Sequence, residues 1–220
     1  MQTRCGRVAG AVVALVLMGA APASAASEWE ITGPAAPPGS ELSAVVSLDD
    51  AGTPALAVRR AGGDVLRPSP IGIATADADL TTGLRLVGGP RTRVVAEDYR
   101  TTVGKRLTRH TLMREARFDL AGAGGARVGL VVRVAADGVA YRYELPSGPG
   151  GVTVLREASS YQLPADAPAW LLPYRPEYES FHVATTAGAA DTSATGFGYP
   201  SLFQVGDGYV LISESDISGR

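Results

Sequence analysis

The fold class follows from residues 127–146, which read Arg127-Val-Gly-Leu-Val-Val-Arg-Val-Ala-Ala-Asp-Gly-Val-Ala-Tyr-Arg-Tyr-Glu-Leu-Pro146. Two apolar runs flank Asp137-Gly138, and this dipeptide is a strong signal for a β-hairpin, because a type I′ turn needs positive φ at both central residues. A two-residue loop at this dipeptide predicts that three cross-strand pairs share one face: Val134 with Tyr141, Val132 with Tyr143 and Leu130 with Leu145. All six side chains are apolar, as a half-buried antiparallel pair requires.

The opposite face of this hairpin carries Arg133, Arg142 and Glu144. The same register places Arg133 directly opposite Arg142, and like charges in that position destabilise a ladder unless something neutralises them. We expect Glu144, which lies diagonal to Arg133, and an acidic residue from a neighbouring strand to do so. The hairpin is predicted to be the central pair of a sheet.

Short β-like segments recur along the rest of the chain, about every ten residues, with turn residues between them. No segment has the 3.6-residue apolar period of an amphipathic helix. This pattern is typical of an all-β sandwich or barrel, and 220 residues suffice for one large domain of this class or two small ones. The predicted strands are 41–48, 54–60, 65–67, 71–73, 84–87, 92–99, 106–120, 152–157, 202–205 and 209–213.

The amino-terminal residues have the features of a secretory signal peptide. Arg4 and Arg7 provide a positive start, Val8 to Ala21 is an apolar run too short for a membrane span, and Ala23-Ser24-Ala25 is a small-residue cleavage site. We therefore expect residues 1–25 to be removed and the mature protein to be secreted or extracytoplasmic. The only cysteine, Cys5, lies in the removed part, so the mature chain would have no disulfide.

The remaining residues divide into an extended, proline-rich lead-in at residues 26–40 and the β-sandwich at residues 41–220. The whole chain has 20 basic and 22 acidic side chains, a formal charge of −2. Without Arg4 and Arg7 the balance is 18 against 22, or −4. This charge argues against nucleic acid or an anionic membrane surface as a partner.

Motifs for self-contained catalysis are missing from the sequence: it has no G-x-S-x-G elbow and no glycine-rich phosphate loop. His110 and His182 are the only histidines, and they lack metal-ligand spacing. We interpret both as ordinary hydrogen-bonded or solvent-facing side chains.

An aromatic and acidic segment, residues 170–181, has the composition of a sugar-contacting site. Aromatic faces cover the apolar faces of pyranose rings, and carboxylates accept sugar hydroxyls or hold a hard cation such as calcium. Composition alone favours the plainer interpretation, in which the aromatic rings are core and the glutamates are solvated. Glu177 and Glu179 are too close in sequence to flank a glycosidic bond from opposite sides.

Four stretches together resemble the N-terminal domain of glycoside hydrolase family 97, a family of α-glucosidases and α-galactosidases. They occur in family order, so that the resemblance covers roughly residue 41 to the end. In this sequence they read Leu66-Arg-Pro-Ser-Pro-Ile-Gly-Ile73, Asp137-Gly-Val-Ala-Tyr-Arg-Tyr-Glu-Leu-Pro146, Ala169-Trp-Leu-Leu-Pro173 and Leu211-Ile-Ser-Glu-Ser-Asp-Ile217.

The resemblance implies a β-supersandwich that packs on a catalytic (β/α)₈ barrel, with the catalytic carboxylates on the barrel. This chain stops at Arg220 without a barrel, so we expect no catalytic residue in it, no hydrolysis by it alone, and a domain that is incomplete at its carboxyl end. In the family, a glutamate shortly after the tryptophan-containing strand helps to bind calcium. Glu177 matches that position, with Glu179 as the alternative if the gap shifts.

From the composition of the aromatic and acidic segment we predict that Trp170, Tyr178 and Glu179 contact substrate. The resemblance implies that calcium is bound only when the barrel is present. No cofactor is expected for this chain alone. The family motif Asn-His-Tyr-Asn-Glu corresponds here to residues 110–115, of which only Glu115 clearly agrees. We therefore do not assign the sugar contact of that family motif to residues 110–115 of this chain.

Three functions remain open from the sequence. The leading interpretation is an exported, non-catalytic domain of a family 97-like glycosidase whose partner is an α-glucoside or α-galactoside. The alternatives are a free-standing carbohydrate-binding or protein-interaction module, and a purely structural domain. The reading frame beyond codon 220 would discriminate between an enzyme fragment and a module.

Overall fold

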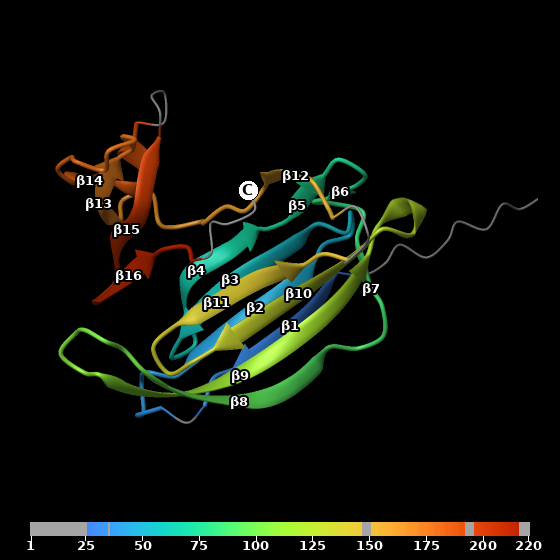
Figure 1. The fold of residues 1–220 in the computed structure, drawn as a ribbon, viewed down its shortest axis with the longest axis horizontal. Coiled ribbons are helices and arrows are strands. Elements are labelled where there is room, and N and C mark those ends of the chain that lie inside the picture. The colour runs from blue at the N-terminus through green and yellow to red at the C-terminus, as the bar shows by residue number, and fades with distance from the viewer. Residues whose placement is uncertain (1–25, 35, 147–150, 192–195, 216–220) are drawn as a thin grey trace, which may run out of the picture.

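The computed structural model describes residues 26–34, 36–146, 151–191 and 196–215, and these residues form an all-β protein (Figure 1). Four antiparallel sheets account for its strands, and two short 3₁₀ turns, Ala123–Gly125 and Ala187–Ala189, are the helical segments of this part of the chain. Within the described ranges, no helix is long and apolar enough to cross a membrane. The predicted signal peptide lies outside these ranges.

The first sheet has four strands in sequential order. Its bounds are β1 Ser27–Thr32, β2 Leu42–Leu48, β3 Pro54–Arg60 and β4 Gly63–Pro70. Strand β1 pairs with β2 and precedes the start expected at residue 41. The segment that contains β1 was predicted as an extended lead-in. It forms a strand instead, because Ile31 is buried in the core and Trp29 packs against the core.

The second sheet has the order β11-β10-β9-β7, and β8 also pairs with β9. Its bounds are β7 Arg85–Leu86, β8 Arg91–Arg100, β9 Thr108–Ala121, β10 Arg127–Val134 and β11 Val139–Glu144. The predicted hairpin is present as β10 and β11, but it is not the central pair. The long strand β9 is central, because β7, β8 and β10 all pair with it.

The register of the β10–β11 hairpin differs by two residues from the prediction. The observed pairs are Val134 with Val139, Val132 with Tyr141 and Leu130 with Tyr143. The Ala135 N–H donates to the Gly138 carbonyl at 2.8 Å, and neither Asp137 nor Gly138 has the positive φ of a type I′ turn. A shift of two residues keeps every side chain on its predicted face, because side chains alternate with a period of two.

The two large sheets pack face to face around one hydrophobic core (Figure 1). Val46 from the first sheet and Phe118, Leu130 and Val132 from the second are almost completely buried. The rings of Trp29 and Phe118 meet across the interface with centroids 5.7 Å apart. These contacts make the protein sandwich-like, in agreement with the predicted fold class.

Strands β8 and β9 continue beyond the core as a long hairpin, here called the β8–β9 arm, residues 97–111 (Figure 1). Nearly all of its residues are exposed. Its cations are Arg100, Lys105, Arg106 and Arg109.

Two smaller sheets follow. One has the order β12-β5-β6, with bounds β5 Ile73–Thr75, β6 Asp79–Leu80 and β12 Val154–Glu157. The other has the order β14-β13-β15-β16, with bounds β13 Pro168–Pro173, β14 Val183–Thr186, β15 Phe197–Val205 and β16 Gly208–Ile212. In Figure 1 this last sheet lies apart from the two large ones, and it has a small core of its own built on Ala169, Leu171 and Phe203.

Candidate functional site

The acidic and aromatic segment predicted as a sugar site begins in β13, where Trp170 lies, and its residues 174–181 belong to the connection between β13 and β14. Glu177, Tyr178 and Glu179 are all exposed. Tyr178 closes a turn, with its N–H donating to the Arg175 carbonyl at 3.0 Å, and has φ of 55°, which is uncommon for a residue other than glycine. The connection therefore presents both carboxylates to solvent.

Tyr178 is held by contacts on two sides. Its ring meets the ring of Tyr174 edge-on, with centroids 6.0 Å apart. On the other side it lies against Gly198 of β15, where an added Cβ would come within 3.2 Å of the Tyr178 ring. Gly198 is thus the residue that lets this ring lie directly on the backbone of the sheet.

Trp170 belongs to a different part of the same sheet. It pairs with Leu202, which in turn pairs with Leu211, and its ring lies 6.1 Å from that of Tyr209. These four residues, Trp170, Leu202, Tyr209 and Leu211, form one apolar sheet face, on which Tyr209 is 66% and Leu211 63% exposed. Among the described residues Trp170 has no ring contact with Tyr178, so the structure does not bring the predicted substrate-binding aromatics into direct contact.

Glu177 and Glu179 have no hydrogen bond or ion pair with any of the described residues. In that same part of the chain, no group of three or more His, Cys, Asp or Glu side chains is placed to hold a metal ion. Calcium takes six to eight oxygen ligands. The donor set that the described residues present therefore does not fit calcium by itself.

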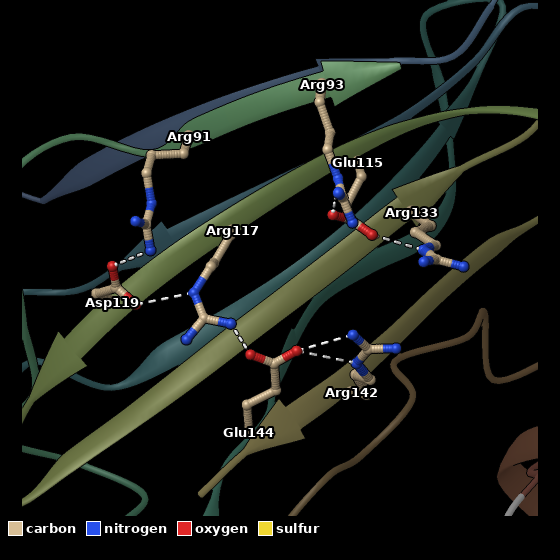
Figure 2. A network of polar contacts seen from close by, with 8 residues as sticks. All are labelled: Arg91, Arg93, Glu115, Arg117, Asp119, Arg133, Arg142 and Glu144. Carbon is tan, nitrogen blue, oxygen red and sulfur yellow. Dashed lines mark hydrogen bonds and ion pairs between the residues drawn. The ribbon is translucent and has the colours of Figure 1, made fainter. Parts of the chain in front are cut away.

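A charged network on the outer face of the second sheet is the most extensive polar arrangement that the structure describes (Figure 2). Glu115 of β9 accepts hydrogen bonds from Arg93 of β8 at 2.6 Å and from Arg133 of β10 at 2.7 Å. Glu115 is only 6% exposed, and the hydrogen bond from Arg93, followed by that from Arg133, holds its pKa below the usual value. Arg133 also bonds Glu97 at 2.8 Å, and its pKa is raised chiefly by Glu115.

The network continues towards β11. Arg117 bonds Asp119 at 3.0 Å and forms an ion pair with Glu144, which also accepts from Arg142 at 2.8 Å. Asp119 in turn accepts from Arg91 at 2.6 Å. The expectation that a neighbouring strand supplies an acid for Arg133 is confirmed. Glu144 neutralises Arg142 rather than Arg133, and the predicted pairing of these two arginines is wrong because the shifted register places Arg133 opposite Ala140.

A cluster of tyrosines joins the smaller sheets to the sandwich. The Tyr143 hydroxyl accepts the Gly72 N–H at 2.7 Å and lies 3.0 Å from the Ser159 hydroxyl, which donates to Glu157 at 2.7 Å. Burial raises the pKa of Tyr143, and it raises the pKa of Tyr141 to about 12. These phenols are therefore protonated at neutral pH and act as hydrogen-bonding groups.

Sequence reasoning missed both the charged network and the tyrosine cluster. The alternation of Arg and acidic residues along β9 was visible, but the pairing depends on which strands lie beside it. His110, interpreted as an ordinary side chain, is exposed and pairs with Asp98 across the β8–β9 arm. It takes no part in a metal site among the described residues.

Comparisons of the sequence and of the structure with known proteins point to the same family. The family model described as "Glycosyl-hydrolase 97 N-terminal" matches residues 36–219. A probable retaining alpha-galactosidase of Streptomyces bingchenggensis (strain BCW-1) is 48% identical over 221 aligned residues, which cover 100% of this chain and 34% of the relative. The chain thus spans about a third of the length of that relative.

Solved structures with the same fold are also enzymes of greater length. A beta-arabinopyranosidase aligns with a TM-score of 0.73 and 29% identity over 80% of this chain and 30% of its own. A variant of a Glycoside Hydrolase Family 97 enzyme from Pseudoalteromonas sp. strain K8, in complex with panose, aligns with a TM-score of 0.66 and 19% identity. That alignment covers 79% of this chain and 26% of the enzyme, and it shows similarity of fold. The family match spans most of the chain, which therefore belongs to the glycosyl-hydrolase 97 N-terminal family.

Proposed function

We propose that this chain is the non-catalytic N-terminal domain of an exported, α-galactosidase-like glycoside hydrolase. The observation that carries the proposal is the full-length match of this chain to about a third of a 48% identical probable retaining alpha-galactosidase. In this proposal the domain is a β-supersandwich that packs on a (β/α)₈ barrel, and the barrel carries the catalytic carboxylates. The signal peptide directs export and is then cleaved after Ala25.

The β13–β14 connection is the part of the domain that we assign to the barrel's carbohydrate site. Glu177 is exposed, is unpaired among the described residues and lies beside Tyr178. It is therefore available to become one ligand of a calcium ion whose other ligands come from the barrel. Trp170, Tyr178 and Glu179 would contact the α-galactoside or α-glucoside.

A chimeric enzyme tests this proposal. This chain replaces the corresponding N-terminal third of the Streptomyces relative, and hydrolysis of an aryl α-galactoside is measured with and without calcium. We expect the chimera to hydrolyse the substrate and the isolated chain to show no turnover, since acid and base must flank one bond. Glu177→Gln in the chimera should lower the calcium affinity and the rate together, roughly tenfold or more, the size typical of losing one ligand or its supporting contact.

The matched control is Glu28→Gln, which changes an exposed glutamate of β1 in the same way. It should leave both readouts unchanged. A chimera that folds but has no activity would contradict the assignment to the enzyme. An active chimera whose calcium affinity and rate are unaffected by Glu177→Gln would reject the role of Glu177 alone.

The alternative of a free-standing carbohydrate-binding module rests on the exposed aromatic side chains of the last sheet. Tyr178 is 54%, Tyr209 66% and Phe181 93% exposed. In that case the isolated chain would itself bind an α-galactoside, and Tyr178→Ala would abolish binding. Absence of sugar binding by the isolated chain would leave the enzyme domain as the better proposal.

A further inference from the structure

The outer face of the β8–β11 sheet contains an open hollow of about 320 Å³, a volume at the lower end of those of small-molecule sites. Four strands contribute to it, and the buried side chain of Val131 from β10 is its apolar member. Its charged lining is Arg91 and Arg93 of β8, Glu115 and Arg117 of β9, and Arg142 and Glu144 of β11 (Figure 2).

Every carboxylate oxygen around this hollow already has a guanidinium partner. The oxygens of Glu115 face Arg93 and Arg133, and those of Asp119 face Arg91 and Arg117. One oxygen of Glu144 faces Arg117 and the other faces Arg142. Each carboxylate of the network therefore has its charge balanced on both oxygens by guanidinium groups.

The guanidinium groups, by contrast, have N–H donors that these ion pairs do not use. An arginine carries five N–H donors. Arg91 binds Asp119 only through Nη2 and Arg93 binds Glu115 only through Nε, and no other hydrogen bond of either side chain lies within the described ranges. Together the five arginines of Figure 2 exceed the carboxylates they bind, Glu97, Glu115, Asp119 and Glu144, by one positive charge.

We propose that this hollow binds an oxyanion, either a free inorganic anion or the carboxylate of an acidic sugar. Planar guanidinium groups match carboxylate and sulfate oxygens in a bidentate geometry, and such charge-assisted bonds are the stronger ones. The acids hold the arginines in place, and an anion would bind the guanidinium N–H groups that these ion pairs leave unused. This site lies on the sandwich rather than on the β13–β14 connection, so it goes beyond the proposed function and does not depend on it.

The two sources of the anion are distinguished by titrating the full chain, at constant low ionic strength, with sulfate and with galacturonate. Neutral galactose serves as the uncharged counterpart of galacturonate. Binding is followed by calorimetry and by the thermal unfolding midpoint. We expect both anions to bind at this hollow and galactose not to bind there. Tighter binding of galacturonate would identify the ligand as an acidic sugar. Tighter or equal binding of sulfate would identify it as an inorganic anion.

Two variants locate the site. Arg91→Gln and Arg142→Gln remove side chains that are 66% and 58% exposed, and each leaves its acid bound to Arg117. Each should therefore fold normally and lower the affinity roughly tenfold, as expected for one hydrogen bond between charged groups. Arg67→Gln, which removes an exposed arginine from β4 on the other sheet, is the matched control and should have no effect.

The proposal is overturned if neither anion binds, or if Arg67→Gln weakens binding as much as the two hollow variants do. It is also overturned if galactose binds as tightly as galacturonate and is equally weakened by Arg91→Gln, because recognition would then not depend on charge. None of these results bears on the activity of the chimeric enzyme.

Discussion

At the scale of single residues, Glu115 is the most constrained charge that the structure describes. It is 6% exposed and bonds arginines from both neighbouring strands. Glu115→Gln keeps the shape of the side chain but leaves Arg93 and Arg133 without a charged partner on β9. We expect the free energy of unfolding to fall by about 2 kcal/mol, as for lost hydrogen bonds to a charged group, because Arg93 is 67% exposed and Arg133 keeps Glu97 as a partner. Urea unfolding at pH 7 measures this change.

Glu97→Gln is the matched control, because Glu97 also bonds Arg133 but is 46% exposed. Exposed ion pairs contribute under about 1 kcal/mol, so this variant should differ little from the parent chain. Equal destabilisation by the two changes would show that burial is not what makes Glu115 important.

The effect of Glu115 should depend on pH in a defined direction. Its folded-state pKa lies below the ordinary value of 4.5, so its stabilising contribution is complete above pH 4.5 and is lost as the pH falls through the folded-state pKa. The difference in stability between the parent chain and Glu115→Gln should therefore shrink below pH 4.5.

At the scale of elements, Tyr143 connects β11 to the segment before β5. Its hydroxyl is the acceptor of the Gly72 N–H at 2.7 Å. Tyr143→Phe leaves this N–H without its acceptor, which should lower the free energy of unfolding by about 1–2 kcal/mol. Tyr141→Phe is the comparison. Its hydroxyl bonds the side chains of Glu157, Ser159 and Tyr161 rather than a backbone N–H, so its loss leaves no backbone donor unsatisfied and should have a smaller effect.

The same cluster should make the protein sensitive to alkali. Tyr199 of β15 belongs to this cluster, because Tyr161 bonds both Tyr141 and Tyr199. The pKa values of Tyr141 and Tyr199 are raised to about 12 by burial, compared with about 10 in an unfolded chain. Their neutral forms stabilise the folded state below pH 10, and this contribution is lost as the pH rises towards 12. Unfolding in urea at stepped alkaline pH would show it.

Sequence patterns located most of the strands, although not β1, β6 or β14, and they did not predict the contacts between strands. Alternation in residues 127–146 correctly identified β10, β11 and the face of each side chain, since a period of two sets the face. It could not set the register, because pairings two residues apart bury the same face. The partner of Arg133 could not be predicted either, because Glu115 lies 18 residues away in sequence, on a strand whose position depends on the whole sheet.

The candidate site was predictable only in part, for a similar reason. For residues 170–181, composition favoured core aromatic rings and solvated glutamates. The glutamates are exposed as expected, but Tyr174 and Phe181 are also exposed, at 42% and 93%. The prediction also grouped Trp170 with Glu177 and Tyr178. In the structure Trp170 lies in β13, and its ring is beside that of Tyr209 in β16. Where a strand ends and a turn begins, residues that are close in sequence need not be close in space.

At the scale of the whole molecule, the apolar sheet face of Trp170, Leu202, Tyr209 and Leu211 continues to β16, an edge strand. Exposed apolar edges pair with other chains. We expect the isolated chain to self-associate, and Leu211→Lys to suppress this by placing a charge on the edge. Light scattering coupled to size-exclusion chromatography measures the association.

Val103→Lys is the control for this prediction, because Val103 is 78% exposed but lies on the β8–β9 arm. It should leave the association unchanged. A parent chain that is monodisperse and melts cooperatively as a monomer would show that the β16 edge needs no partner.

The β8–β9 arm has a practical consequence of a different kind. Lys105, in its turn, is the only lysine of the chain, and the arm also carries Arg100, Arg106 and Arg109. An amine-reactive fluorophore or surface coupling reagent therefore attaches at the tip of the arm, with the amino terminus as the other reactive amine. Because the arm stands clear of the hydrophobic core, a label on Lys105 allows rotation and docking to be followed without disturbing the sandwich.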